Sequence, residues 1–581
     1  MHRTDSPGVG FAGQGINGAP RSTLPERRLL PEGRIATRRI EGGWWCTGPR
    51  PGDRMDIPDD SSMKQRARFL TAAVLCACVC SMAAGQPAAK RVYPKRWVYV
   101  SNPLNTDQDM AALRQIVETA SAHGLNGMVL TGLDRIDLQG SEYFVHLKQV
   151  KEMCDRLGIE IIPSGFGTGY GGALLDHDRN LAEGLAVKGA LFVAEKGRAV
   201  FQPEREPVVV ASSGAAPVTR FEKLLTVIPH RNYRVAVRVR GTGVAPDATL
   251  EIRADTLDKR RNECWFETAF ASGTGWREYT TGFNSASADK LNFNIGIEDG
   301  LAGKVEIADL RIEEVGLLNV VRRAGTPLAV RGEKDGMLYQ EGRDFAPVAD
   351  PQLSFRFDHE NPSIQLTAGS RIREGERLRV DYYHGVLIYK DQVAACMSEP
   401  KVFEIWSKQF PLIQKYLAPK TYLLTLDEER MGGTCETCRR RGMSMAAMLG
   451  DYATRLYDLV HASSPGAEVF VWSDMFDPNH NAHGDYYLVD GDYSGSWRYL
   501  PKDMRIACWN YDTRDRSLAH FSKLGFKTLA AAYYDADDLT NPKGWLESLD
   551  RTPGAVGIMY TTWNNKYQLL PSFGDLVKKR E

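Results

Sequence analysis

Short apolar segments alternate with amphipathic helical segments in two separate parts of the chain, and this alternation constrains the fold more than any other feature. The first part has three strands, at Trp97–Val100, Gly127–Leu130 and Ile159–Pro163. The second part has five, at Tyr422–Leu426, Val469–Trp472, Arg505–Trp509, Thr528–Tyr533 and Val556–Thr561. Strands that alternate with helices form parallel sheets. Eight such strands predict an α/β fold, a (β/α)8 TIM barrel.

Helical periodicity accompanies these strands. Apolar residues recur at helical spacing over Asp107–Ala122, Tyr143–Leu157 and Glu399–Tyr416. Between the two parts, the sequence consists almost entirely of short alternating strands, such as Tyr233–Arg240 and Lys304–Ile312. Even spacing with Gly and Asp turns predicts an inserted all-β sandwich or jelly-roll domain. We therefore expect a first barrel part at 96–184 (strands 1–3), an inserted β-sandwich region at 185–383 and a second barrel part at 384–578 (strands 4–8).

The composition is that of a soluble globular protein with more than one domain. The chain has 581 residues, 73 basic and 73 acidic residues and 43% hydrophobic residues. A chain this long is expected to form two or three domains. Balanced charge argues against a surface for nucleic acid or an anionic membrane.

The N-terminal region predicts export. Residues 1–62 are rich in Gly, Pro and Arg, and we expect them to be an extension without packed structure, with translation beginning at Met63. Residues 63–85 combine a basic start, a short apolar run and small residues, which is the pattern of a secretory signal peptide. The apolar run is too short for a transmembrane span, although a disordered arm before a membrane anchor is the competing interpretation. We therefore expect an exported protein, periplasmic or extracellular. Leu75–Cys78 weakly resembles a bacterial lipoprotein box, so attachment by a lipid anchor is an alternative to a free exported chain.

Six cysteines follow the signal region, and two of them form the motif Cys435-Glu-Thr-Cys438. A single CxxC pair is weak evidence for zinc. A local disulfide after the acidic cluster described next is favoured, and reduced thiols are the alternative.

Three carboxyl groups follow one buried strand directly. In the segment Thr421–Arg430, the apolar run is followed by Asp427, Glu428 and Glu429. In α/β barrels the chemistry lies just beyond the carboxyl ends of the strands. Three adjacent carboxylates cannot all ionise easily, so at least one pKa should be displaced. The alternative is a helix N-terminus, where acidic side chains favour the macrodipole.

Aromatic and polar side chains follow the later barrel strands. The residues that we expect to bind substrate are Trp472, Asp474, Trp509, Tyr533, Tyr534, Asp535, Trp563 and Asn564. Aromatic faces cover the apolar C–H surface of a pyranose, while carboxylates and amides hold its hydroxyls. The strand ends therefore predict a sugar site.

These residues resemble family 20 glycoside hydrolases, the β-N-acetylhexosaminidases, over residues 96–172 and 390–578. Those enzymes are (β/α)8 barrels with an Asp-Glu pair at the end of strand four. The resemblance implies that Glu428 is the general acid and that Asp427 orients the acetamide of the substrate, which attacks the anomeric carbon. It implies that Trp472, Trp509 and Trp563 enclose the acetamide and that Tyr533 or Tyr534 binds it. The chain departs from the family at Leu424–Leu426, where the family has His-x-Gly-Gly, and the extra Glu429 leaves open which Glu is the acid.

The segment from about Pro207 to Val315 resembles jelly-roll carbohydrate-binding modules in its strand pattern. Trp265 or Trp276 would be its sugar contact, but the favoured interpretation places both in the sandwich core. The long segment Asp477–Asp485 is expected to be a lid or subsite loop. Its His and Asp residues lack the spacing of metal ligands, so sugar contact is favoured over a metal site.

We therefore predict an exported glycoside hydrolase that needs no cofactor and acts on an oligosaccharide or polysaccharide. The expected reaction is exo-cleavage of β-linked N-acetylhexosamine by substrate-assisted retention. Two alternatives stay open. One is a two-carboxylate glycosidase with Asp474 or Asp535 as the nucleophile. The other is a carbohydrate-binding protein without catalysis, because fold alone does not specify function.

Overall fold

The computed structural model describes residues 91–579, except 211–216, 246–247, 271–272, 274 and 299–301. The predicted extension at 1–62 and the predicted signal peptide at 63–85 lie outside the described residues. Within the described part of the chain, no helix has the length and apolar character needed to cross a membrane.

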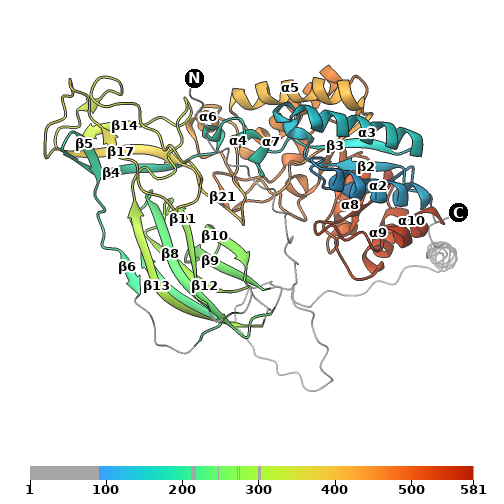
Figure 1. Cartoon of the computed structure of the whole chain (residues 1–581), viewed down its shortest axis with the longest axis horizontal. Helices are drawn as coiled ribbons and strands as arrows, with labels where there is room; N and C mark the ends of the chain where they lie inside the picture. The colour runs from blue at the N-terminus through green and yellow to red at the C-terminus, as the bar shows by residue number, and fades with distance from the viewer. Residues whose placement is uncertain are drawn as a thin grey trace, which may run out of the picture. The chain divides into compact units, whose positions relative to one another are not determined.

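Eight parallel strands close into a barrel (Figure 1). In order around the barrel they are β1 (Lys95–Val100), β2 (Gly127–Leu130), β3 (Glu160–Gly165), β18 (Thr421–Leu424), β20 (Glu468–Trp472), β22 (Arg505–Cys508), β23 (Thr528–Tyr533) and β24 (Ala555–Thr561). Strand β24 pairs with β1, which completes the circle. The predicted TIM barrel is confirmed, with all eight strands where the sequence placed them.

Helices surround the barrel. The long ones are α2 (Asp107–Ala122), α3 (Ser141–Leu157), α5 (Pro400–Leu417), α7 (Met445–Ser463), α8 (Arg514–Lys523), α9 (Thr540–Asp550) and α10 (Leu570–Lys578). Helix α2 begins with a capping box, in which Thr106 accepts from the amide of Asp109 and the Asp109 side chain accepts from the amide of Thr106. Short helices are α4 (Gly172–Leu175) and α6 (Glu436–Arg440), and short 3₁₀ segments are η1 (Leu133–Leu138), η2 (Arg179–Leu181), η3 (Asp474–Phe476) and η4 (Ser496–Tyr499).

Alternation along the strands divides the core into two layers. One set of side chains fills the barrel interior, including Trp97, Ile162, Leu423, Phe470 and Met559. The other set packs outward under the helices. Since successive side chains of a strand point to opposite faces, the interior set also determines which residues beyond each strand face the mouth of the barrel.

The insertion between β3 and β18 contains antiparallel sheets. A six-stranded sheet has the order β15-β14-β17-β4-β5-β16. Its strands are β4 (Leu185–Glu195), β5 (Arg198–Phe201), β14 (Ala329–Gly332), β15 (Leu338–Tyr339), β16 (Ile364–Gln365) and β17 (Arg377–His384). Because β4 and β17 pair directly, the segment between β5 and β14 forms a second unit nested inside the first.

This nested unit is a sandwich of two four-stranded sheets, β10-β9-β12-β7 and β11-β8-β13-β6. The strands are β6 (Val208–Val210), β7 (Arg220–Thr226), β8 (Asn232–Thr242), β9 (Thr249–Asp255), β10 (Asn262–Ala269), β11 (Arg277–Asn284), β12 (Lys290–Ile297) and β13 (Lys304–Val315). Alternating apolar residues such as Val235, Val237, Ile252 and Ile295 fill the space between the sheets. A two-stranded ladder, β19 (Met431–Gly432) with β21 (Leu488–Val489), lies outside both units.

The chain leaves and re-enters the barrel at one place, the neck of the insertion, formed by residues 181–183 and 394–396. The amide of Glu183 donates to the carbonyl of Ala394 at 2.8 Å, and the amide of Cys396 donates to the carbonyl of Leu181 at 2.8 Å. The two ends of the insertion are therefore hydrogen-bonded to each other.

Candidate active site

The candidate active site lies where the carboxyl ends of the barrel strands meet. Leu423 faces the barrel interior, and alternation then turns Asp427 inward beyond the end of β18. The same rule places Trp472 at the end of β20 and Trp509 beyond β22 in the interior set. Residues from different strands are thus brought to one point, which is the arrangement that α/β barrels use for chemistry.

Five rings form an aromatic cluster at this point: Tyr99, Trp472, Trp509, Tyr534 and Trp563. The Trp563 ring centroid lies 5.0 Å from that of Tyr99, 6.2 Å from that of Tyr534 and 6.5 Å from that of Trp472. Trp509 stacks on Tyr534 at 6.0 Å with an interplanar angle of 12°. The structure therefore brings together the three tryptophans that the sequence singled out, and it adds Tyr99 from β1.

Asp427 lies near the aromatic cluster. Its charge acts on Tyr99 and Tyr534. Burial, with the charges of Asp474 and Glu428, raises the pKa of Asp427 well above its usual range. Its Oδ1 atom is buried and has no hydrogen-bond partner among the described residues, and the same holds for the indole Nε1 of Trp472. The centre of the site thus contains an acceptor and a donor that are free to bind another group.

Glu428 points to a different set of groups. Its carboxylate accepts a hydrogen bond from the Tyr170 hydroxyl at 2.5 Å and pairs with Arg430 at 2.8 Å. Its backbone has a φ of 50°, in the left-handed region, and its amide donates to Asp474 Oδ2 at 2.8 Å. Such backbone conformations are held in place by the surrounding contacts and cluster at functional sites. The side chain of Glu428 is 19% exposed, so it can reach a ligand from the outer side of the site.

Arg430 is almost completely buried, and tyrosine rings enclose it. The guanidinium carbon lies 4.4 Å from the ring centroid of Tyr389 and 5.1 Å from that of Tyr487. Its Nη1 atom donates to Gln392 Oε1 at 2.8 Å. Burial alone would lower the pKa of Arg430, but the Glu428 carboxylate raises it well above its usual range. A permanent positive charge is therefore fixed beside Glu428.

Glu429 is turned away from the site. It is fully buried, and its carboxylate accepts hydrogen bonds from the Thr168 hydroxyl at 2.9 Å and the Thr168 amide at 3.2 Å. Burial raises its pKa to about 7. This group ties the loop after β18 to the loop after β3, and no substrate can reach it in this conformation.

Asp474 is buried, and donors surround it. It accepts from the amide of Glu428, from Asn481 Nδ2 at 3.0 Å and from Trp509 Nε1 at 3.2 Å. Burial raises its pKa, and nearby His480 opposes that shift. The His480 ring lies 4.3 Å from that of Trp509, so the segment after β20 that was expected to be a subsite loop packs against the aromatic cluster.

Asp535 organises the loop after β24. It accepts from the hydroxyl of Thr562, from the amide of Trp563 at 2.8 Å and from the amide of Asn564 at 3.2 Å. The exposed Asn564 side chain also donates to it, at 3.3 Å. Asp535 therefore fixes the position of Trp563, and its acceptor capacity is used within the protein.

The two tyrosines that the sequence left as alternatives face opposite ways. Tyr533 stacks on Tyr560 at 4.1 Å in the outer layer, whereas Tyr534 belongs to the aromatic cluster. Three consecutive residues with positive φ, Tyr533 at 85°, Tyr534 at 56° and Asp535 at 60°, turn the chain sharply and shift the alternation by one residue.

The sandwich tryptophans contradict the expectation that they are core residues, since neither belongs to the sandwich core. Trp265 stacks on Tyr487 at 5.2 Å and meets Tyr389 edge-on at 5.6 Å. These are the two rings that enclose Arg430. Trp276 instead lies under Arg238 and Arg240, whose guanidinium carbons are 5.6 and 5.0 Å from its ring. Trp265 therefore packs against the rings around Arg430, whereas Trp276 makes cation–π contacts within the sandwich.

Sequence reasoning missed Tyr99, Tyr170, Gln392 and Arg430. Tyr99 could have been found, because it alternates with Trp97 along β1. Tyr170 lies in the Gly-rich segment after β3. Its position beyond the end of a barrel strand could have identified it as a candidate site residue. Gln392 comes from the end of the insertion, and nothing in its sequence context connects it with β18.

The sequence matches no protein-family model and no curated protein. Among solved structures there are distant matches. The β-N-acetylhexosaminidase from Bacteroides fragilis NCTC 9343 has 10% identity over 83% of this chain and 65% of its own, with a TM-score of 0.35. The family 20 β-N-acetylhexosaminidase from Streptomyces coelicolor A3(2) has 8% identity over 84% of this chain and 64% of its own, with a TM-score of 0.33.

A CBM4 structure matches 24% of this chain and 91% of its own length, with 12% identity and a TM-score of 0.14. The chain spans slightly less than two thirds of the length of each hexosaminidase.

Proposed function

We propose that this chain is a glycoside hydrolase with its active site at the carboxyl ends of the barrel strands. The observation that carries the proposal is the pair of buried atoms without partners, Asp427 Oδ1 and Trp472 Nε1, within the aromatic cluster. Buried polar atoms without partners are costly, so a ligand that supplies their partners would be bound favourably here. A sugar ring suits this site, because its C–H faces cover aromatic rings while its polar groups satisfy the free acceptor and donor.

We further propose cleavage of an N-acetylhexosaminide with help from the acetamide of the substrate. A two-carboxylate mechanism needs a carboxylate that is free to attack. Donors surround both alternatives, since Asp474 accepts three hydrogen bonds and Asp535 holds the loop of Trp563. Asp427 keeps a free oxygen, which can accept the acetamide N–H and stabilise the charge that develops on it.

In this mechanism Glu428 delivers the proton to the leaving group. It lies on the outer side of the site and is more exposed than its neighbour Arg430. For this step Glu428 leaves its ion pair with Arg430 when the sugar binds. The Tyr170 hydroxyl, which already donates to Glu428, can keep the carboxyl group oriented during that change.

The reverse assignment also has an observation in its favour. Burial and the charge of Asp474 raise the pKa of Asp427, as a general acid requires. The two assignments predict opposite leaving-group behaviour. If Glu428 is the acid, Glu428→Gln should spare aryl glycosides with good leaving groups; if Asp427 is the acid, Asp427→Asn should do so.

The experiment that tests the function is turnover of a panel of aryl glycosides, with and without a 2-acetamido group. Cleavage of 2-acetamido substrates and inhibition by a thiazoline mimic of the oxazolinium intermediate would support the proposal. Cleavage of other glycosides, with azide rescue of Asp474→Ala or Asp535→Ala, would establish a two-carboxylate enzyme instead. Sugar binding without turnover on any substrate would establish a carbohydrate-binding protein.

A further inference from the structure

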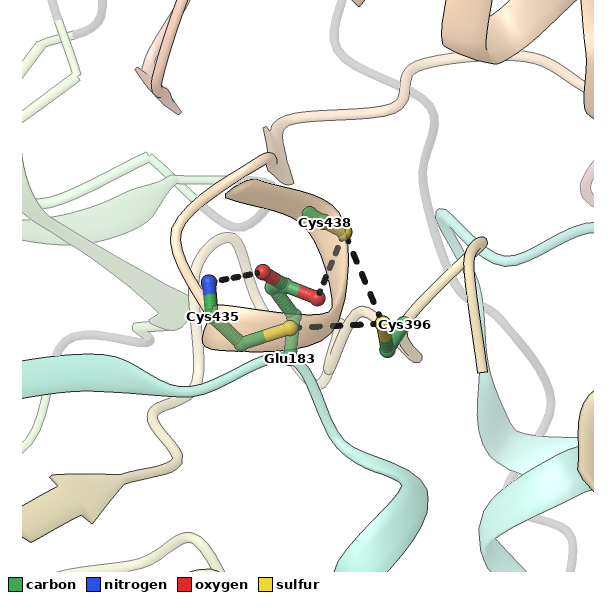
Figure 2. Close-up of side chains that lie close together, drawn as sticks. All are labelled: Glu183, Cys396, Cys435 and Cys438. Atoms are coloured by element: carbon green, nitrogen blue, oxygen red, sulfur yellow. Dashed lines mark hydrogen bonds between the residues drawn. The ribbon is translucent and has the colours of Figure 1, made fainter. Parts of the chain in front are cut away.

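Four buried side chains converge at the neck of the insertion, away from the aromatic cluster. They are Glu183, Cys396, Cys435 and Cys438, the cysteine–glutamate cluster shown in Figure 2. None of the four is more than 1% exposed. All three cysteines are free thiols, so the disulfide that the CxxC motif was expected to form is absent from the structure.

The distances within the cluster match those around a tetrahedral metal ion. The Sγ atom of Cys396 lies 3.4 Å from that of Cys435 and 3.6 Å from that of Cys438. Cys438 Sγ lies 3.9 Å from Glu183 Oε2, and the four donor atoms all lie within 4.8 Å of one another. Zinc–sulfur bonds of about 2.3 Å place the sulfurs of a tetrahedral site about 3.8 Å apart. The four atoms therefore already stand near the corners of such a site.

The carboxylate of Glu183 is oriented by its surroundings. Its Oε1 atom accepts three hydrogen bonds, from the Thr434 amide and hydroxyl at 2.9 Å each and from the Cys435 amide at 2.8 Å. The Oε2 atom is left facing the sulfurs (Figure 2). Fixing one oxygen so that the other points at the centre is how outer contacts orient metal ligands.

Charge also favours a cation here. Three thiolates and a carboxylate cannot be buried together without compensation. One positive group is close by: the charge of the buried Arg323 acts on Cys396 and Cys435, but Arg323 also pairs with Glu399 at 3.1 Å. A divalent ion would balance part of the remaining negative charge.

We propose that Glu183, Cys396, Cys435 and Cys438 bind one Zn²⁺ ion as a structural site. Thiolate ligands select zinc over magnesium, calcium or manganese. Four buried protein ligands leave no position for water or substrate, which distinguishes a structural site from a catalytic one. The site would join the two ends of the insertion to helix α6, which follows the acidic segment by a few residues.

One further contact supports a fixed junction at this place. A Cβ atom on Gly325 would lie 1.8 Å from the Thr437 hydroxyl oxygen, and the Gly325 carbonyl accepts from the Glu436 amide at 2.9 Å. The turn of the insertion and the CxxC helix can approach this closely because residue 325 has no side chain.

The test is the metal content of the full chain, purified without chelator, by inductively coupled plasma mass spectrometry. We expect about one zinc per chain. Cys435→Ser and Glu183→Ala should lower the zinc content, whereas the matched control Cys154→Ser, which removes a buried thiol on α3, should retain it. If the cluster variants do not fold, the absorption spectrum of the wild-type chain loaded with Co²⁺ tests the site. Co²⁺ bound by tetrahedral thiolate ligands gives intense visible and charge-transfer bands.

Two results would overturn the proposal. One is a wild-type chain that takes up neither zinc nor cobalt. The other is a disulfide joining two of the three cysteines, found by mass spectrometry of an unreduced digest of freshly purified protein. Both readouts are independent of glycosidase activity, so the zinc site and the proposed function fail or succeed separately.

Discussion

The backbone amide of Glu428 donates a 2.8 Å hydrogen bond to the Oδ2 atom of Asp474. This bond ties the loop after β18 to the loop after β20 and holds Glu428 in its left-handed conformation. Asp474 thus acts through its neighbours. It accepts one hydrogen bond from the backbone amide of Glu428 and another from the indole N–H of Trp509, and these bonds position both residues. The site thus divides into groups that face the substrate and groups that position them.

Glu428→Gln should reduce turnover of substrates with poor leaving groups by about 10²- to 10⁴-fold, because proton transfer from a positioned acid contributes that much. Activated aryl glycosides should be affected far less. Asp427→Asn should slow both classes, since loss of charge stabilisation costs about 3 kcal/mol whatever the leaving group. Steady-state kinetics on a series of aryl leaving groups measures both effects, and equal slopes for the two variants would contradict the assignment.

Asp535→Asn should raise KM more than it lowers kcat, because the Trp563 loop loses its charged acceptor while Asp427 and Glu428 stay in place. Hydrogen bonds to charged groups contribute about 1.5–3 kcal/mol. The matched control is Asp538→Asn, two residues before α9, where the side chain accepts from the amide and hydroxyl of Thr540 at 2.8 and 3.0 Å. The control should have the KM and kcat of the wild type. An equal rise in KM in both variants would contradict a specific role of Asp535 in holding Trp563.

Trp265→Ala should weaken activity although the residue belongs to the sandwich. It removes the ring that stacks on Tyr487, which in turn packs on Arg430. Aromatic pairs of this kind contribute about 0.5–1.5 kcal/mol, so we expect about a two- to tenfold loss in kcat/KM. Trp276→Ala is the control, because Trp276 contacts Arg238 and Arg240 instead. If both variants keep full activity, the sandwich does not support the site.

Glu429→Gln should change how stability depends on pH. The pKa of this buried group is about 7 in the folded chain, against 4.5 for the ordinary carboxyl group. The folded state holds the proton more tightly, so this contribution to stability is complete below about pH 4.5 and is lost as pH rises through about 7. A shift of this size corresponds to on the order of 3 kcal/mol.

Gln stays neutral and can still accept from Thr168. The variant should therefore match the wild type near pH 4 and become the more stable of the two above pH 7. Urea unfolding at several pH values measures the difference. Glu263, whose pKa burial also raises to about 7, titrates in both proteins and cancels in the comparison.

The barrel could be predicted because each of its strands is an apolar run followed by a helix, a pattern that is local in the sequence. Position at the strand ends also predicted Asp427, Trp472 and Trp509 at the mouth. It left Tyr533 and Tyr534 as alternatives, and the choice could not be made from the sequence because three left-handed residues shift the alternation there and bring Tyr534 inward. Arg430, Gln392 and the cysteine–glutamate cluster escaped prediction because their partners come from separate segments of the chain, and only the closed barrel makes them neighbours.

The neck of the insertion has a consequence for how this chain folds. Strands β3 and β18 are neighbours in the barrel, yet contacts between their loops join residues 261 positions apart, as Thr168 and Glu429 do. Closing so long a loop costs entropy before the strands gain any contact, and non-local pairing slows folding. If the insertion folds first, its hydrogen-bonded ends bring the two barrel halves together, and the effective loop becomes short. The speed of barrel closure should then depend on the stability of a domain that contributes no strand to the barrel.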